Sequence, residues 1–120
     1  MKTILVARDN ALARLRLTSL LRGAGYRVIA VASGRQALTA MLLETPDLAL
    51  VGLGLPELDG LGVVQAMREV PRLRNVPVIA LRWLPLPWRR SDTPAGGFSA
   101  WLLEPSPRAR LLREVRRWIR

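Results

Sequence analysis

Four charged residues and one glycine each follow a short apolar run, and their side chains decide what chemistry this chain offers. They are Arg8, Asp9, Gly52, Arg82 and Glu104. Two guanidinium groups and two carboxylates balance in charge, and one guanidinium can donate hydrogen bonds to two carboxylates at once. We therefore expect an internal cluster of ion pairs with Arg82 at its centre. The alternative is that each side chain is solvated separately.

Other residues that could do chemistry form incomplete patterns. Gly52 and Gly54 resemble part of a dinucleotide-binding loop, but Glu57 takes the place of the third glycine. Glu57 and Asp59 are close enough in sequence to suggest a paired acid and base. Ser99 has no histidine anywhere in the chain to act as its base. We therefore expect no enzyme activity.

Length and composition limit the kind of protein this is. The chain has 120 residues, half of them hydrophobic, which suits one domain spanning residues 1–120. The absence of cysteine and histidine excludes disulfide bonds and the usual zinc sites. No apolar run approaches the roughly 20 residues of a membrane span, and the N-terminus lacks the apolar core of a signal peptide. We expect a soluble cytoplasmic protein without membrane contact.

The net charge is +10, and every basic residue except Lys2 is arginine. Residues 1–60 carry seven basic and five acidic residues, whereas residues 61–120 carry twelve and four. Such an excess in one half of the chain favours anionic partners. It could equally reflect the arginine-rich composition that a GC-rich genome produces.

Apolar runs alternate with helical segments along the chain. The runs lie at residues 3–7, 28–31, 48–51, 78–81 and 101–103. Their continuous apolarity indicates strands that are covered on both faces, hence a parallel sheet in a three-layer α/β sandwich. In such sheets ligands bind beyond the carboxyl ends of the strands, where the five residues named first lie.

The helices have recognisable starts and ends. One follows Asn10, one begins at a capping box of Ser33 and Gln36, one spans residues 62–70 before Pro71, and one follows Pro107. Between the fourth and fifth strands, three prolines at positions 85, 87 and 94 argue against a long helix. A fourth helix should therefore be short or broken, within residues 88–93 at most.

The chain resembles the receiver domains of response regulators over essentially its whole length. The resemblance rests on ILVARDN, GYRVIAVASGRQAL, DLALVGLGLPELDG, VPVIALR and AWLLEP. It implies the flavodoxin-like (CheY-like) doubly wound fold, with five parallel strands in the order 2-1-3-4-5. It also places Glu57 and Asp59 in a solvent-facing turn.

The resemblance implies a phosphorylation pocket from which most of the chemistry is missing. Gly52 stands at the place of the phosphate-accepting aspartate and offers no nucleophilic oxygen. Arg8 stands at the first acidic place, and Asp9 is the only retained metal ligand. Arg82 stands at the hydroxyl place and Glu104 at the lysine place. We therefore expect a degenerate receiver without metal or cofactor.

Without phosphorylation, one surface should persist and bind constitutively a protein partner or a second copy of the chain. The face of the fourth helix, fifth strand and last helix is the candidate, and its expected components are Trp83, Trp88, Arg89, Arg90, Trp101, Arg110, Arg113 and Arg117, because tryptophan and arginine are frequent at binding hot spots. Alternatively, the arginines are a solvated face and Trp101 belongs to the core, as we expect of Trp118. A nucleic-acid-binding domain on a receiver scaffold is the second functional class.

Overall fold

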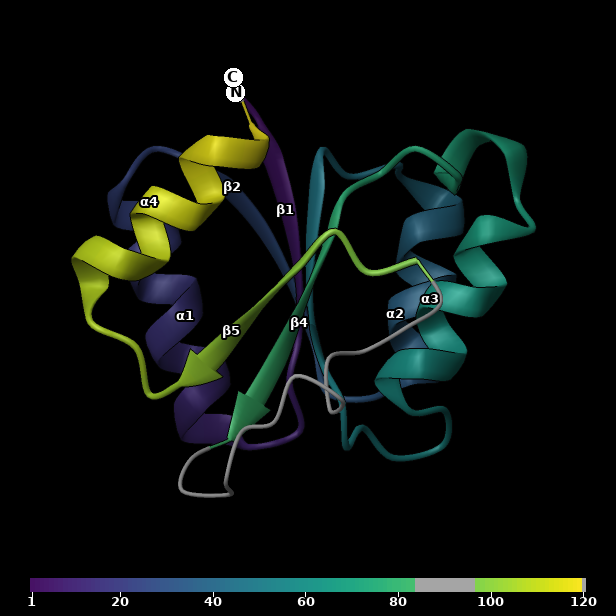
Figure 1. The fold of residues 1–120 in the computed structure, drawn as a ribbon, viewed down its shortest axis with the longest axis horizontal. Helices are drawn as coiled ribbons and strands as arrows, with labels where there is room; N and C mark the ends of the chain where they lie inside the picture. Colours follow the sequence, from purple (N-terminus) through teal and green to yellow (C-terminus); the bar gives the residue numbers. More distant parts are fainter. Residues whose placement is uncertain (84–96, 120) are drawn as a thin grey trace.

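The computed structural model describes residues 1–83 and 97–119, with the backbone alone at Trp83. Its strands are β1 (Thr3–Ala7), β2 (Arg27–Val31), β3 (Leu48–Gly52), β4 (Val78–Trp83) and β5 (Ala100–Glu104). Its helices are α1 (Ala11–Gly23), α2 (Gly34–Leu43), α3 (Gly60–Arg68) and α4 (Arg108–Trp118), and the short 3₁₀ helix η1 spans Pro71–Leu73 (Figure 1).

All strand pairs are parallel, and the strand order is β2-β1-β3-β4-β5. This order confirms the flavodoxin-like fold that the sequence predicted. The register pairs Ala7 with Val51, Gly52 with Leu81, and Trp83 with Glu104. The carboxyl ends of the four strands β1, β3, β4 and β5 therefore meet at one edge of the sheet.

Helices cover both faces of the sheet (Figure 1). Because side chains alternate along a strand, β1 sends Ile4 and Val6 to one face and Leu5 and Ala7 to the other. The first face packs against α1 and α4, and the second against α2 and α3. All four β1 side chains are fully buried, as expected of a central parallel strand.

The local signals at the helix starts are largely confirmed. The side chains of Asn10 and Ser33 accept hydrogen bonds from the backbone of α1 and α2, at 2.9 and 3.1 Å. The third helix begins at residue 60 rather than 62, because Asp59 caps it by accepting from the amide of Gly62 at 2.8 Å. The expected short helix within 88–93 lies outside the described residues.

Arg68 joins the end of α3 to the segments that follow it. Its guanidinium donates to the backbone carbonyls of Leu73, Arg74, Val76 and Gly97, at 2.5 to 3.3 Å. Burial lowers the pKa of the Arg68 guanidinium from its ordinary value. A guanidinium nevertheless stays charged in proteins, so Arg68 is a permanent donor at this junction.

No described helix has the length and apolarity that a membrane crossing needs.

Candidate functional site

The floor of the site is the backbone at the end of β3. Gly52 is buried there, and the start of α3 presses against it. A Cβ atom added to Gly60 would come within 2.5 Å of the Gly52 carbonyl oxygen, so only glycine allows this approach. The amide of Gly60 also donates to the carbonyl of Leu53 at 3.1 Å. The start of α3 thus fixes the position of the backbone at the end of β3, which forms the floor of the pocket.

The side chain of Arg8 lies over Gly52. Its Cδ atom is 3.4 Å from the position that a Cβ atom at residue 52 would take. The missing side chain at Gly52 therefore leaves room that the aliphatic stem of Arg8 fills.

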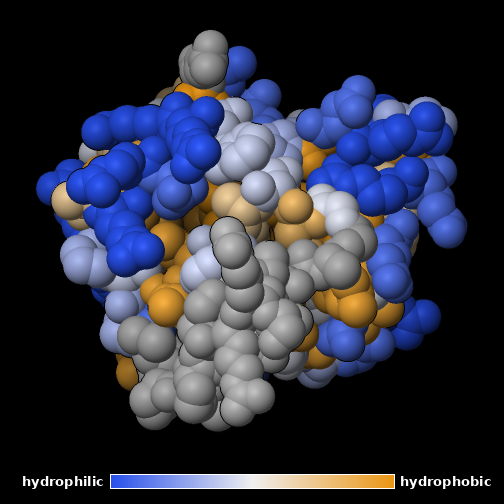
Figure 2. All heavy atoms as spheres, in the orientation of Figure 1, coloured by the Kyte–Doolittle hydropathy of each residue, from blue (hydrophilic) through white to orange (hydrophobic). Residues whose placement is uncertain are grey.

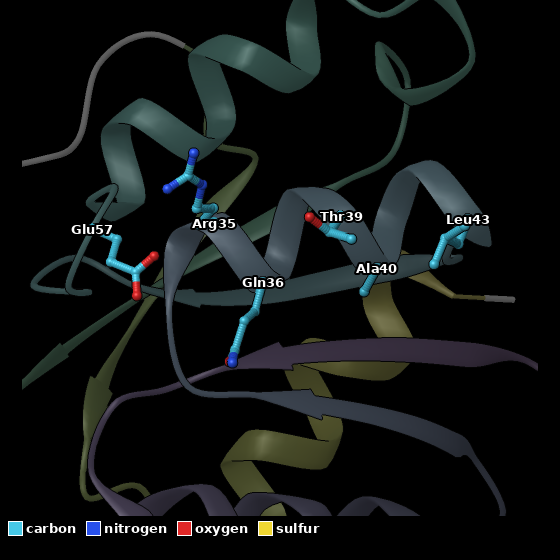
Figure 3. Close-up of a pocket in the computed structure, with 6 residues that line it drawn as sticks. All are labelled: Arg35, Gln36, Thr39, Ala40, Leu43 and Glu57. Carbon is cyan, nitrogen blue, oxygen red and sulfur yellow. The ribbon is translucent and has the colours of Figure 1, made fainter.

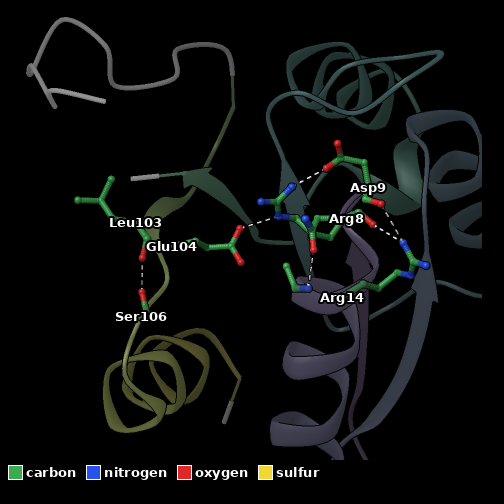
Figure 4. Close-up of polar contacts among 8 residues, drawn as sticks. Arg8, Asp9, Arg14, Leu103, Glu104 and Ser106 are labelled. Carbon is green, nitrogen blue, oxygen red and sulfur yellow. Dashed lines mark hydrogen bonds and ion pairs between the residues drawn. The ribbon is translucent and has the colours of Figure 1, made fainter. Parts of the chain in front are cut away.

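The guanidinium of Arg8 joins two carboxylates (Figure 4). Its Nε donates to Oε1 of Glu104 at 2.7 Å, and its Nη1 donates to Oδ1 of Asp9 at 2.5 Å. The side chains of Arg8 and Glu104 are only 12% and 5% exposed, whereas that of Asp9 is 45% exposed. Arg8 and Glu104 thus form a nearly buried ion pair, and Asp9 extends it toward solvent.

Arg14 fixes the backbone from which Arg8 projects. Its Nη1 donates to the carbonyl oxygens of Arg8 and Asp9, at 2.8 and 3.3 Å (Figure 4). The amide of Arg8 also donates to the carbonyl of Val31 at 3.1 Å. Sequence reasoning did not assign Arg14 to the site, because its partners Arg8 and Asp9 precede the helix on which it lies.

The expectation that Arg82 would be the bridge is wrong, since Arg8 holds this place. Arg8 follows β1, directly beside the gap at Gly52, and its stem reaches across that gap to β5. Arg82 lies on β4, two strands away from β1 in the sheet, opposite Leu103, and its side chain is half-buried. The structure therefore brings Arg8, Asp9, Gly52 and Glu104 together as expected. The arginine that joins the two carboxylates is Arg8 and not Arg82.

The residues of the expected interaction face have different surroundings. Arg110, Arg113 and Arg117 are exposed on α4, and Trp101 is half-buried on β5. Trp118 packs partly buried against the core, as predicted. Trp83 is described by its backbone alone, and Trp88, Arg89 and Arg90 lie outside the described residues.

Sequence reasoning missed two surface hollows. One of about 270 Å³ adjoins the ion pair and is lined by Asn10, Leu12, Ala13, Arg16, Glu104 and Pro105. Another of about 440 Å³ lies on the α2 side, lined by Arg35, Gln36, Thr39, Ala40, Leu43 and Glu57 (Figure 3). All four polar side chains of the second hollow are exposed, so no buried group is poised to hold a ligand there.

The site residues do not suit a divalent cation. Magnesium prefers several oxygen ligands in octahedral geometry, usually including carboxylates. Here Asp9 and Glu104 are both bound to the guanidinium of Arg8. Among the described residues there is no group of three side chains that could hold a metal ion. The arrangement offers a closed ion-pair cluster and no nucleophile at Gly52.

Comparisons with known proteins agree on one family. The family model described as the response regulator receiver domain matches residues 4–82. The polar-differentiation response regulator DivK of Brucella ovis is 28% identical over 118 residues, covering 98% of this chain and 96% of that protein.

Solved structures extend the likeness through the last helix. The receiver domain of a sensor histidine kinase from Pseudomonas aeruginosa is 35% identical, with a TM-score of 0.90 and coverage of 98% of this chain and 97% of that one. That structure has a magnesium ion coordinated in its active-site cleft. The chemotaxis protein CheY4 of Vibrio cholerae is 26% identical, with a TM-score of 0.89 and coverage of 99% of both chains.

Proposed function

The chain belongs to the response regulator receiver domain family, and we propose that it acts there as a binding module whose state is independent of phosphorylation. The observation that carries this proposal is the ion pair of Arg8 and Glu104 over Gly52. In this account Gly52 replaces the aspartate that accepts phosphate, and glycine has no oxygen to accept it.

The ion pair also supports a single persistent state. It joins the ends of β1 and β5 and is nearly buried, so breaking it would leave a charge without its partner in a poorly solvated site. A two-state protein changes its populations only when a ligand binds one state better than the other. Without a covalent phosphate, this pocket lacks the ligand that would shift the populations.

Magnesium, which the family resemblance leads one to consider, does not fit this pocket. The pocket contains the positively charged guanidinium of Arg8. Both nearby carboxylates, those of Asp9 and Glu104, already accept hydrogen bonds from this guanidinium. We therefore assign the pocket a structural role and assign no reaction to it. The protein would act through its surface.

The surface that we assign to a protein partner is the face formed by β4, β5 and α4. On this face Trp101 is half-buried, while Arg110, Arg113 and Arg117 are exposed. Arginine and tryptophan are enriched among residues that contribute most to binding. The partner would be another protein or a second copy of the chain.

The test is to measure binding to an identified partner, or self-association by sedimentation velocity, with and without acetyl phosphate and magnesium. We expect unchanged affinity, no added phosphate by intact mass spectrometry, and weaker binding of the R113E variant. R35E, on α2, is the matched charge-reversal control. An affinity that changes together with a covalent phosphate adduct would disprove the proposal.

A further inference from the structure

The positive charge of the protein is separated between its two helical layers. Helices α1 and α4 cover the same face of the sheet, and together they contain eight arginines and one glutamate, a net charge of +7. On the other face, α2 and α3 contain two arginines and no acidic residue, a net charge of +2, and with the strand and loops between them residues 34–76 have four arginines and five acidic residues, a net charge of −1. A compositional bias toward arginine alone does not explain this separation.

Most arginines of α4 are exposed and uncompensated. Arg108, Arg110, Arg113 and Arg116 make no hydrogen bond and no ion pair with the residues that the structure describes. Nη1 of Arg117 lies 3.8 Å from Oε1 of Glu114. Glu114 is half-buried and is the one acidic residue of this helix. Figure 2 shows hydrophilic side chains gathered over α4. The helix thus presents an unneutralised positive surface.

The arginines of α4 form a stripe along its outer side. Arg110, Arg113 and Arg117 lie three and four positions apart, which places them on one side of a helix. Seven residues of helix span about 10 Å. A DNA duplex presents one phosphate charge per roughly 1.7 Å of its axis, so about six charges lie within the same length. Guanidinium groups match phosphate oxygens in geometry as well as in charge.

The outer side of α4 taken alone, without the half-buried Trp101 of β5 that belongs to the proposed protein contact, suits a nucleic acid better than an acidic protein. Protein interfaces have an apolar core, but α4 exposes no large hydrophobic side chain. Binding to a phosphate backbone needs closely spaced cations and no such core. Single strands are usually held by stacking on aromatic side chains, and the one tryptophan of α4 is half-buried against the core.

We propose that the arginine stripe of α4 (Arg110, Arg113 and Arg117), flanked by Arg108 and Arg116, binds the phosphate backbone of duplex nucleic acid without reading its sequence. The exposed arginines Arg16 and Arg22 of α1 strengthen the positive potential of the same layer. This inference does not depend on the proposed protein contact. Because both use the same three arginines, a protein partner and a duplex would compete.

The test uses a fluorescently labelled 24-base-pair DNA duplex of mixed sequence and the full chain, with anisotropy measured from 50 to 200 mM salt. Binding should weaken steeply with salt, since each neutralised phosphate contributes about −0.9 to the slope of log K against log salt. The variant R110Q/R113Q/R117Q should reduce the magnitude of this slope by about two to three. The single strand of the same sequence should bind more weakly than the duplex.

The matched control is R35Q/R72Q/R74Q, which removes the same charge from the opposite layer. Circular dichroism establishes that both variants are folded. The control should keep the slope of the original protein. Three results would overturn the proposal. The first is the absence of duplex binding at 50 mM salt, and the second is an equal reduction of the salt slope in both variants. The third is binding of poly-glutamate at least as tight as that of the duplex. The last result would instead indicate an acidic protein partner.

Discussion

Arg8 determines the chemistry of the pocket because its side chain takes two roles at once. Its stem fills the space above Gly52, and its guanidinium binds Glu104 and Asp9. The sequence identified Arg8, Asp9 and Glu104 as members of this cluster, together with Arg82, which is not one of them, since strand ends are readable from apolar runs. It did not identify the bridging arginine, because that depends on which stem runs across Gly52 rather than on charge balance.

The nearly buried pair of Arg8 and Glu104 predicts a strongly non-additive response to mutation. R8M should lower the free energy of unfolding by about 3–5 kcal/mol, because it leaves the nearly buried carboxylate of Glu104 without its partner. E104M should lower it less, because the guanidinium of Arg8 keeps its ion pair with Asp9. The double variant R8M/E104M should recover much of that loss, since two apolar side chains need no compensation. Urea unfolding of the three variants measures the coupling.

The exposed pair of Arg27 and Glu44 is the control for this cycle. Their side chains are 52% and 43% exposed, so water and salt screen the interaction. R27M should therefore change the free energy of unfolding by less than about 1 kcal/mol. Additive losses in the Arg8 and Glu104 variants would show that the pair is not coupled as described.

At the scale of the elements, strands were easier to predict than helix ends. The central strands are buried on both faces and appear as continuous apolar runs, so the positions of β1 and β3 were readable to within a residue. The start of α3 was not predicted to within a residue, since the expected first residue was 62 and the helix begins at Gly60. Asp59 was interpreted as a solvated turn residue, whereas its exposed side chain caps that helix.

The cap at Asp59 makes a specific prediction for α3. D59A should lower the free energy of unfolding by about 1 kcal/mol, because the amide of Gly62 loses its acceptor. D59N should cost much less, since asparagine is an equally good N-cap. Equal stability of D59A and the original protein by urea unfolding would contradict the assigned role.

At the scale of the whole molecule, the topology gives meaning to a charge imbalance that the sequence showed only along the chain. The sequence located the excess of arginine in residues 61–120. The strand order places α1, from the other half of the chain, on the same face as α4. The separation of charge by layer was therefore not readable from linear sequence, although the fold that creates it was.

The most direct test of the central claim is a pair of ¹H–¹⁵N NMR spectra, recorded with and without magnesium and beryllofluoride, a mimic of the aspartyl phosphate. Because Gly52 offers no carboxylate and Arg8 covers it, the amide signals of residues 8, 9, 52, 82 and 104 should not move. Saturable shifts of those signals would show that the pocket still binds metal and phosphate, and would contradict the account of a receiver held in one state by its own ion pair.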